Sequence, residues 1–348
     1  MQPLIDVIMK NVNEIYSPGE VVVVDETMIP FRGRLHFRQY NPSKSSRYGV
    51  KIYKLCTPTG FVCSFRIYCG QDPIIAGLDK SGSVVVSLGR DLLNEGRIFI
   101  IDNWYTSLPL ANYLRKKRTD VCGTLRKNRK NLPQAVVNAK LKHGEIIARQ
   151  ANNITVLKWH DKRDVLMMST FHDSEMVDTE KTDRQRNTVL KPTAVLDYNK
   201  WKQGIDVSDQ MSTYYSSLRK SLIWYKKVAI ELIFGSIVVN SQLLFNNITS
   251  QKLSLLQFTQ ELVRSLLDLP NELPNPTTPI SNNIHFLEKI PRKEDNKIVR
   301  KRCTECYKGL KNTAGTSTAS RKTKQVDTEC KICEKAFCIP CFAATHTR

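Results

Sequence analysis

Two apolar runs in the first third of the chain each lead directly into an aspartate. Val21–Val24 precedes Asp25, and Arg97–Ile101 precedes Asp102. Because four consecutive β-branched residues favour an extended strand that is covered on both faces, we expect the first run to be a buried strand. The second run has the same apolar character. The pattern therefore predicts two buried strands, each with a carboxylate at its end.

The neighbouring segments predict the rest of a mixed sheet. Gly49–Cys56 and Phe61–Cys69 are rich in β-forming residues and flank a Pro/Gly turn, which is typical of a hairpin. After Asp102, Ser107 can cap a helix, and Val121–Leu125 has the pattern of a further strand. Strands that alternate with a helix favour an α/β architecture.

The pattern changes several times after residue 128. Short β-like runs separated by charged stretches continue to about residue 193, and helical periodicity returns over Val207–Leu267. The most apolar stretch, Val228–Leu244, is interrupted by Glu231 and by two amide side chains. It is too short and too broken for a membrane span, so we expect a buried helix and no membrane partner.

These changes divide the chain into seven segments. The predicted segments are an N-terminal helical remnant (1–19), the first part of an α/β core (20–128), an inserted β-rich subdomain (129–195), the second part of the core (196–213), a helical region (214–270), a linker (271–300) and a small cysteine-rich module (301–348).

Composition adds a polyanionic partner to this picture. The 348 residues carry a formal net charge of +20, and 41% of them are apolar, as in a globular protein. Lysine and arginine bind phosphates largely by displacing counterions, so nucleic acid is an expected partner, although charge alone does not separate DNA from RNA or an anionic membrane surface. The N-terminal residues lack the pattern of a secretory signal, and ten cysteines without such a signal favour reduced thiols or metal ligands over disulfides.

The aspartates suggest a centre for divalent cations. Asp206 and Asp209 are three residues apart at an expected helix start and would share one face of that helix, which is the geometry that a shared metal site requires. Mg²⁺ ions prefer carboxylate oxygens, and a pair of them roughly 3.5–4 Å apart can activate water and stabilise a leaving oxygen. A single aspartate after a strand is more often a turn or cap residue, and Asp209 could simply be a favourable charge at a helix N-terminus. Glu26 is left out, because the next residue along a strand points to the opposite face.

The local sequences around these acids are more specific than their spacing. They are VVDETMIPFRGR around Asp25, IDNWYTS around Asp102, and GIDVSDQ around Asp206 and Asp209. These blocks, in this order, resemble the signature blocks of piggyBac-type transposases, and the resemblance covers nearly the whole chain. It implies an RNase H-like core in which Asp25, Asp102 and Asp206 form the catalytic triad and Asp209 is an additional acid.

The resemblance also implies an activity and a location. Family members attack DNA phosphodiesters with water and then with a 3′-hydroxyl, in a reaction that depends on Mg²⁺ or Mn²⁺. Hairpin-ended intermediates, insertion at TTAA sites and a nuclear location follow by the same analogy. The expected partners are double-stranded DNA and, in a complete protein, a second copy of the chain.

The chain departs from the family pattern at its start. Only 24 residues precede Asp25, whereas family members carry a long N-terminal region that packs with the helices after the last aspartate. We therefore expect the helices at about 212–267 to lack their usual partner. Smaller departures are Gln203 and Ser45. A second hypothesis is a domesticated, catalytically silent protein that binds DNA or chromatin.

Several basic and aromatic residues are candidates for DNA contacts. Arg34 and Lys51 follow Asp25, and Arg126 begins a basic run directly after the predicted strand Val121–Leu125. Together they predict a track for phosphates, although each basic run could equally be a solvated face. The resemblance places Trp224 where a base can stack, and a core position is an equal alternative.

The cysteine-rich end predicts zinc. Three Cys-x-x-Cys pairs are followed by a histidine, and two such pairs can complete a tetrahedral site. The ligands are Cys303, Cys306, Cys330, Cys333, Cys338, Cys341 and His346. Seven ligands are one short of two sites, and the eighth could be absent, could lie beyond the chain end or could be Asp327. A ubiquitin-ligase RING is the competing use of this pattern, but the remaining sequence resembles a transposase.

Overall fold

The computed structural model describes residues 1–42, 44, 46–182, 188–268, 285–291 and 297–346. Ser45 and most of the predicted linker at 271–300 lie outside this part. The chain forms two compact units, Met1–Ser265 and Leu266–Arg348, which are described separately below.

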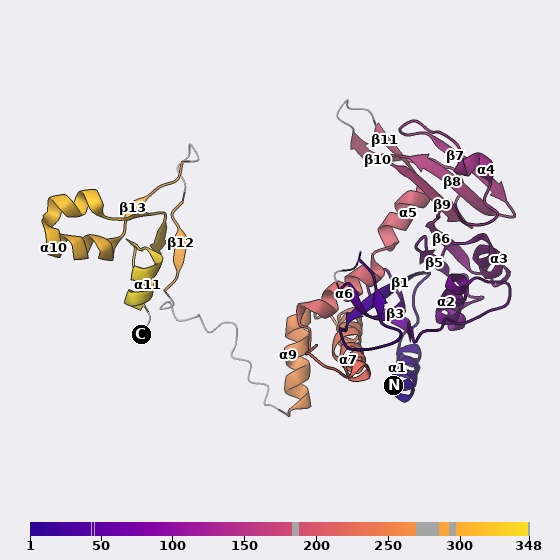
Figure 1. Ribbon diagram of the computed structural model, residues 1–348, viewed down its shortest axis with the longest axis horizontal. Helices are drawn as coiled ribbons and strands as arrows, with labels where there is room; N and C mark the ends of the chain where they lie inside the picture. The colour runs from indigo at the N-terminus through magenta and orange to yellow at the C-terminus, as the bar shows by residue number, and fades with distance from the viewer. Residues whose placement is uncertain (43, 45, 183–187, 269–284, 292–296, 347–348) are drawn as a thin grey trace. The chain divides into compact units, whose positions relative to one another are not determined.

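A nine-stranded mixed sheet forms the centre of the first unit (Figure 1). Its order is β2-β3-β1-β5-β6-β9-β8-β7, and β4 pairs with β3. The strands of this sheet are β1 (Val21–Pro30), β2 (Gln39–Tyr40), β3 (Tyr48–Cys56), β4 (Val62–Ile67), β5 (Ile98–Ile101), β6 (Asp120–Thr124), β7 (Ile146–Ala151), β8 (Ile154–His160) and β9 (Asp164–Ser169). The expected β3–β4 hairpin and the strands β5 and β6 are confirmed.

Helices and a second hairpin complete this unit. They are α1 (Gln2–Ile15), α2 (Lys80–Leu88), η1 (Arg90–Leu92), α3 (Leu108–Lys116), α4 (Gln134–Val137), β10 (Met176–Thr182), β11 (Thr188–Pro192), α5 (Thr193–Trp201), α6 (Gly204–Tyr214), α7 (Trp224–Glu231), the π-helix η2 (Leu232–Ile237), α8 (Val238–Ile248) and α9 (Leu255–Leu266). Ser107 caps α3 as expected, because its side chain accepts a hydrogen bond from the N–H of Leu110. The strands β7–β9 of the predicted insertion continue the central sheet, since β9 pairs with β6.

The first strand is longer than its sequence pattern predicts. β1 runs over Val21–Pro30, so Asp25 lies inside the strand and not at its end. β1 continues because it pairs with β3 along most of its length. Its parallel pairing with β5, however, stops at Val24 opposite Ile101. Asp25 therefore lies at the end of the β1–β5 ladder, beside Asp102.

Apolar side chains cover both faces of the sheet. Val22 and Val24 join a cluster that includes buried residues of α2 and α3, whereas Val23 joins the opposite cluster with residues of α5, α6 and α7. This alternation is the two-residue period of a strand. Asp25 consequently belongs to the Val23 face, which is the face that α6 covers.

The long apolar helical segment after α6 is anchored in this core. Among the described residues, Trp224–Ile248 is the one helical stretch long and apolar enough to cross a membrane. Val228 and Val239 are buried, and the Asn240 side chain exchanges two hydrogen bonds with the backbone of Val62, at 2.7 and 2.8 Å. The segment is longer than the predicted Val228–Leu244, so the expectation that it is too short to cross a membrane is wrong. It is also only partly buried, since Ile233 and Phe234 are exposed.

The second unit is small and has few apolar contacts. Its elements are β12 (Leu287–Lys289), β13 (Lys301–Arg302), α10 (Thr304–Lys322), β14 (Gln325–Val326), β15 (Thr328–Cys330), β16 (Lys335–Ala336) and α11 (Ile339–His346). β12 pairs with β15, so the unit begins earlier than the predicted boundary at 301. Its buried cluster consists of Cys303, Val326, Ala336 and Cys338. A core of this size does not stabilise a domain by itself.

Gly204 allows α6 and the β3–β4 hairpin to approach closely. A Cβ added at Gly204 would lie 2.3 Å from the carbonyl oxygen of Thr57 in the β3–β4 turn. We predict that Gly204→Ala lowers the free energy of unfolding by about 1–3 kcal/mol, because the clash is with backbone and outweighs the gain of about 1 kcal/mol expected for alanine in a helix. Urea unfolding measures this. Gly19→Ala is the control, since no atom lies within 4 Å of its added Cβ, and equal stability of the two variants would contradict the prediction.

Candidate metal centre

Asp25 and Asp102 are brought together by the end of the parallel β1–β5 ladder. Asp102 follows β5 directly, and its Oδ1 accepts a hydrogen bond of 2.7 Å from the N–H of Trp104. Burial raises the pKa of Asp25 to about 8, and repulsion from Glu26 adds to this. Burial also raises the pKa of Asp102, against hydrogen bonding by Trp104. Two desolvated carboxylates of this kind are stabilised by a nearby cation.

The helix α6 carries the other two predicted acids to the same face. Asp206 is exposed in its first turn. Asp209, one turn later, accepts hydrogen bonds at Oδ1 from Thr27 Oγ1 (2.8 Å) and from Lys54 Nζ (2.9 Å). Thr27 lies two residues after Asp25 on β1, so both side chains share the face that α6 covers.

Lys44 lies near three of the four aspartates and near Glu26. Its Nζ lies 3.8 Å from Asp25 Oδ2 and donates a hydrogen bond of 2.8 Å to the carbonyl of Glu26. Burial acts to lower the pKa of Lys44, but four nearby carboxylates outweigh burial and raise it. These carboxylates are Asp25, Glu26, Asp206 and Asp209. Strands and helix therefore converge on one acidic centre.

Glu26 belongs to this acidic neighbourhood although it lies on the other face of the sheet. Its carboxylate faces Tyr105, whose hydroxyl donates a hydrogen bond to it at 3.3 Å, as strand alternation requires. However, β5 ends at Ile101, so β1 has no partner strand on that side at Glu26. The charge of Glu26 consequently acts on both Asp25 and Asp102.

The donor set fits hard divalent cations. It consists of carboxylate oxygens, which Mg²⁺ and Mn²⁺ prefer. In the described part of the chain, only cysteine and histidine sets bring three or more ligand atoms within 4.8 Å of one another. The carboxylates are more widely spread, which is compatible with two cations roughly 3.5–4 Å apart.

The second unit contains two sets of zinc-type ligands. The first is Cys303, Cys306, Cys338 and Cys341. Three of its sulfur–sulfur distances are 3.5, 3.7 and 3.8 Å, close to the separation of about 3.8 Å expected for thiolates around one zinc with Zn–S bonds of about 2.3 Å. Burial acts to raise the pKa of Cys303, but backbone hydrogen bonds at Cys306 and Cys338 lower it to about 7. That shift favours the thiolate form.

The second set supplies the ligand that was missing from the sequence pattern. It consists of His285, Cys330, Cys333 and His346. Cys333 Sγ lies 3.1 Å from His285 Nδ1 and 3.1 Å from His346 Nε2. His285 therefore completes the eight ligands, and Asp327 is not needed. The two sets alternate along the chain, which is a cross-braced arrangement.

Comparisons with known proteins agree with these features. A family model described as Transposase IS4 matches residues 1–242. The human piggyBac transposable element-derived protein 3 is 24% identical over 343 residues, covering 93% of this chain and 54% of the relative. The human chimeric ERCC6-PGBD3 protein is also 24% identical and is covered over 30% of its length.

A solved structure gives the same answer at the level of the fold. It is the cryo-EM structure of the piggyBac transposase synaptic complex with hairpin DNA, with a TM-score of 0.66 and 25% identity. The match covers 86% of this chain and 69% of the other. The chain belongs to the piggyBac-type transposases. It spans about half the length of the human piggyBac-derived protein 3.

The candidate DNA contacts of this transposase chain have different surroundings. Arg34 is exposed. Arg126 is exposed too, and its Nε donates a hydrogen bond of 2.8 Å to Asn103 Oδ1, directly after Asp102. Trp224 is half-buried and packs edge-to-face on Phe37, with ring centroids 5.1 Å apart.

Lys51 occupies a box of aromatic rings. Its Nζ lies 4.5 Å from the centroid of Tyr53, 4.7 Å from Tyr68 and 5.1 Å from Trp104. Burial lowers the pKa of Lys51, although Asp72 and Glu26 oppose this. The ammonium group is therefore stabilised largely by ring faces.

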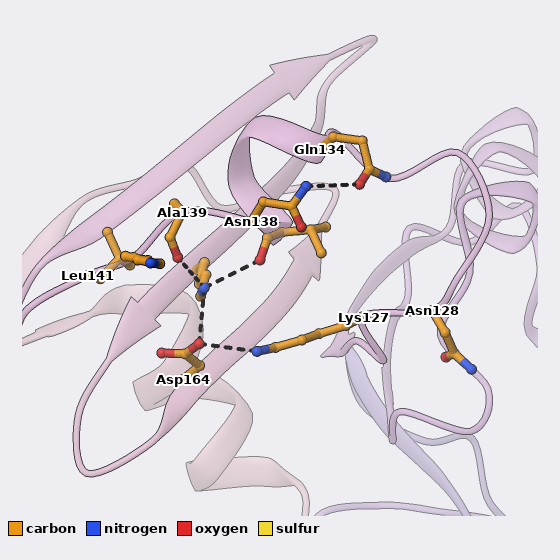
Figure 2. Close-up of a pocket in the computed structure, with 10 residues that line it drawn as sticks. Lys127, Asn128, Gln134, Asn138, Ala139, Leu141 and Asp164 are labelled. Atoms are coloured by element: carbon orange, nitrogen blue, oxygen red, sulfur yellow. Dashed lines mark hydrogen bonds and ion pairs between the residues drawn. The ribbon is translucent and has the colours of Figure 1, made fainter.

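Part of the basic run after β6 is neutralised inside the protein. Lys127 and Asp164 line a pocket of about 700 Å³ and form an ion pair of 3.2 Å. Figure 2 shows this pair among the residues that line the pocket. The same carboxylate pairs at 3.0 Å with Lys158, which is 3% exposed and also bonds to two backbone carbonyls. Arg129 pairs with Asp79 at 2.8 Å. Arg126 and Lys130 of this run are also exposed, and no ion pair of either is found in the described part of the chain.

Sequence reasoning did not identify Lys44, Lys54, Thr27 or His285. Lys54 could have been found, because it lies in the predicted hairpin strand and the β1–β3 register places it opposite Asp25. Lys44 lies in an irregular connection between β2 and β3. His285 lies 18 positions before the first Cys-x-x-Cys pair. Neither Lys44 nor His285 lies in a sequence motif that indicates its role.

The eighth ligand can be tested by counting zinc. We predict that the wild-type chain binds two zinc ions and that His285→Ala binds one, because three ligands hold zinc more weakly than four. Atomic emission analysis of the purified, dialysed proteins gives the ratio of zinc to protein. Asp327→Asn should keep two. Loss of one zinc in Asp327→Asn, with two retained in His285→Ala, would show that the ligand assignment is wrong.

Proposed function

We propose that this piggyBac-type transposase chain cuts and joins DNA strands at the acidic centre of its first unit. The observation that carries the proposal is the convergence of four aspartates on one face. Asp25 and Asp102 come from adjacent parallel strands, and Asp206 and Asp209 come from the helix that covers them. The charges of Asp25, Asp206 and Asp209 all act to raise the pKa of Lys44.

Asp25, Asp102, Asp206 and Asp209 are the residues that would hold Mg²⁺ or Mn²⁺. When bound, the cations would activate water or a 3′-hydroxyl and stabilise the leaving oxygen. The raised pKa of Asp25 and of Asp102 supports this role, because carboxylates that are desolvated by burial and repelled by Glu26 gain from cation binding. The Lys44 ammonium, 3.8 Å from Asp25 Oδ2, offsets part of the negative charge of this centre.

The finer features follow from the family resemblance and belong to the same proposal. An RNase H-like core would consist of residues 20–128 and 196–213, with residues 129–195 inserted between them. Arg34, Lys51, Arg126 and Trp224 would contact double-stranded DNA, and the second unit would hold two zinc ions. Hairpin-ended intermediates, TTAA targets, a homodimer and a nuclear location are expected on the same ground.

Strand cleavage tests the central claim. We predict that the chain cuts labelled transposon-end DNA when Mn²⁺ or Mg²⁺ is present and that Asp102→Ala lowers the rate by more than about 100-fold, the upper range for residues that only support a metal ligand. Denaturing gel electrophoresis measures the cut strands. Asp91→Ala, an exposed aspartate of η1, should cut like the wild type.

Two outcomes of this experiment are informative against the proposal. Cutting that persists unchanged in Asp102→Ala would rule out the acidic centre as the active site. DNA binding without cutting in the wild-type chain would instead identify a domesticated, catalytically silent protein.

The DNA contact of Arg126 makes a separate prediction about salt. Each phosphate contact contributes a slope of about −0.9 to the plot of log affinity against log salt concentration. We predict that Arg126→Ala reduces the magnitude of this slope by about 1, whereas Lys158→Met leaves it unchanged because that ammonium is 3% exposed. Fluorescence anisotropy at several salt concentrations provides both slopes. Equal slopes for wild type and Arg126→Ala would show that Arg126 does not contact phosphate.

A further inference from the structure

A buried lysine lies directly beneath the last of the four aspartates. Lys54 is 1% exposed and projects from β3, in register with Asp25 on β1. Its Nζ donates a hydrogen bond of 2.9 Å to Asp209, from α6. A buried ammonium is costly unless a carboxylate accompanies it, so this contact couples the sheet to the helix.

Both hydrogen bonds to Asp209 reach the same oxygen. Thr27 Oγ1 donates to Oδ1 at 2.8 Å, and Lys54 Nζ donates to Oδ1 at 2.9 Å. Thr27 is 7% exposed and belongs to a strand, so neither donor is free to move far. Two fixed donors on one oxygen set the orientation of the carboxylate. The second oxygen, Oδ2, is left for another ligand.

A second carboxylate accompanies the same ammonium. Glu231 at the end of α7 is 9% exposed, and burial raises its pKa while the Lys54 charge opposes that rise. Its carboxyl folds over Gly235, where an added Cβ would meet Glu231 Oε1 at 2.8 Å. Gly235 belongs to the π-helix η2, a form often found at functional sites. Lys54 is thus compensated from two helices, which keeps it in place beneath Asp209.

We infer that Lys54 and Thr27 are positioning residues that hold Oδ1 of Asp209 so that Oδ2 is offered to a divalent cation. The inference rests on the proposed function of the acidic centre. Carboxylates that ligate metals are commonly oriented by hydrogen bonds of this kind, and removing such a partner typically weakens metal binding or activity by about 10–100-fold.

A purely electrostatic role for Lys54 predicts the opposite sign. If the ammonium acted only through its charge, removing it would strengthen the binding of a cation nearby. Thr27→Val separates the two cases, because it removes a hydrogen bond and keeps both shape and charge. A positioning role requires that both Thr27→Val and Lys54→Met weaken binding.

The test measures Mn²⁺ binding independently of activity. Electron paramagnetic resonance of free Mn²⁺, titrated into the full zinc-loaded chain, gives the dissociation constant. We expect it to rise about 10-fold in Thr27→Val and between about 10- and 100-fold in Lys54→Met. Thr213→Val is the control, since that exposed α6 hydroxyl bonds only to the carbonyl of Gln210. Its dissociation constant should match the wild type.

The outcomes separate this inference from the proposed function. An unchanged constant in Thr27→Val, or tighter binding in Lys54→Met, would overturn the positioning role while the wild type still binds Mn²⁺. A wild-type chain that binds no Mn²⁺ would overturn both. Thermal unfolding of each variant shows whether it is folded, and Thr27→Val alone decides the question if Lys54→Met does not fold.

Discussion

Carboxylates can share the end of a buried sheet only if cations offset their repulsion. In this chain the constraint arises where the β1–β5 ladder stops, because Asp25 and Asp102 then lie beside each other with Glu26 close by. Two lysines offset this repulsion: Lys54 lies on β3, and Lys44 lies in the connection before β3. Lys54 is buried and fixed against Asp209, whereas Lys44 is partly exposed beside Asp25. The positions of the acids therefore depend on the positions of these two lysines.

The second unit meets a similar constraint with different chemistry. Half of its buried cluster is cysteine, so potential metal ligands occupy positions that apolar side chains fill in the first unit. Because each ligand set joins residues far apart in the chain, zinc would close loops as well as fill the core. The free energy of metal binding then contributes directly to folding. For this unit, structure and metal occupancy are not separable.

The sequence predicted the features that depend on local pattern and missed those that depend on long-range pairing. The hairpin and the cap at Ser107 follow from local sequence pattern, whereas the meeting of Asp25 with Asp102 was expected from the family resemblance. The length of β1 does not, because β3 stabilises it beyond its apolar run. Arg126 and Arg129 look alike in sequence, but Arg129 is paired with Asp79, 50 positions away. His285 is likewise identified as a ligand only by its position beside Cys330, Cys333 and His346 in the folded chain.

The net charge of +20 overstates the charge available for phosphates. Lys54 and Lys158 are buried, and their ammonium groups are used by carboxylates and carbonyls of the protein. Lys51 is held among aromatic rings. Counterion release counts only cations that reach a phosphate, so DNA affinity would depend on exposed residues such as Arg34 and Arg126. The buried cations have a different role, since Lys54 pairs with Asp209 of the acidic centre and Lys158 pairs with Asp164. The burial of each side chain distinguishes cations that can contact phosphate from cations that pair inside the protein, and composition does not report burial.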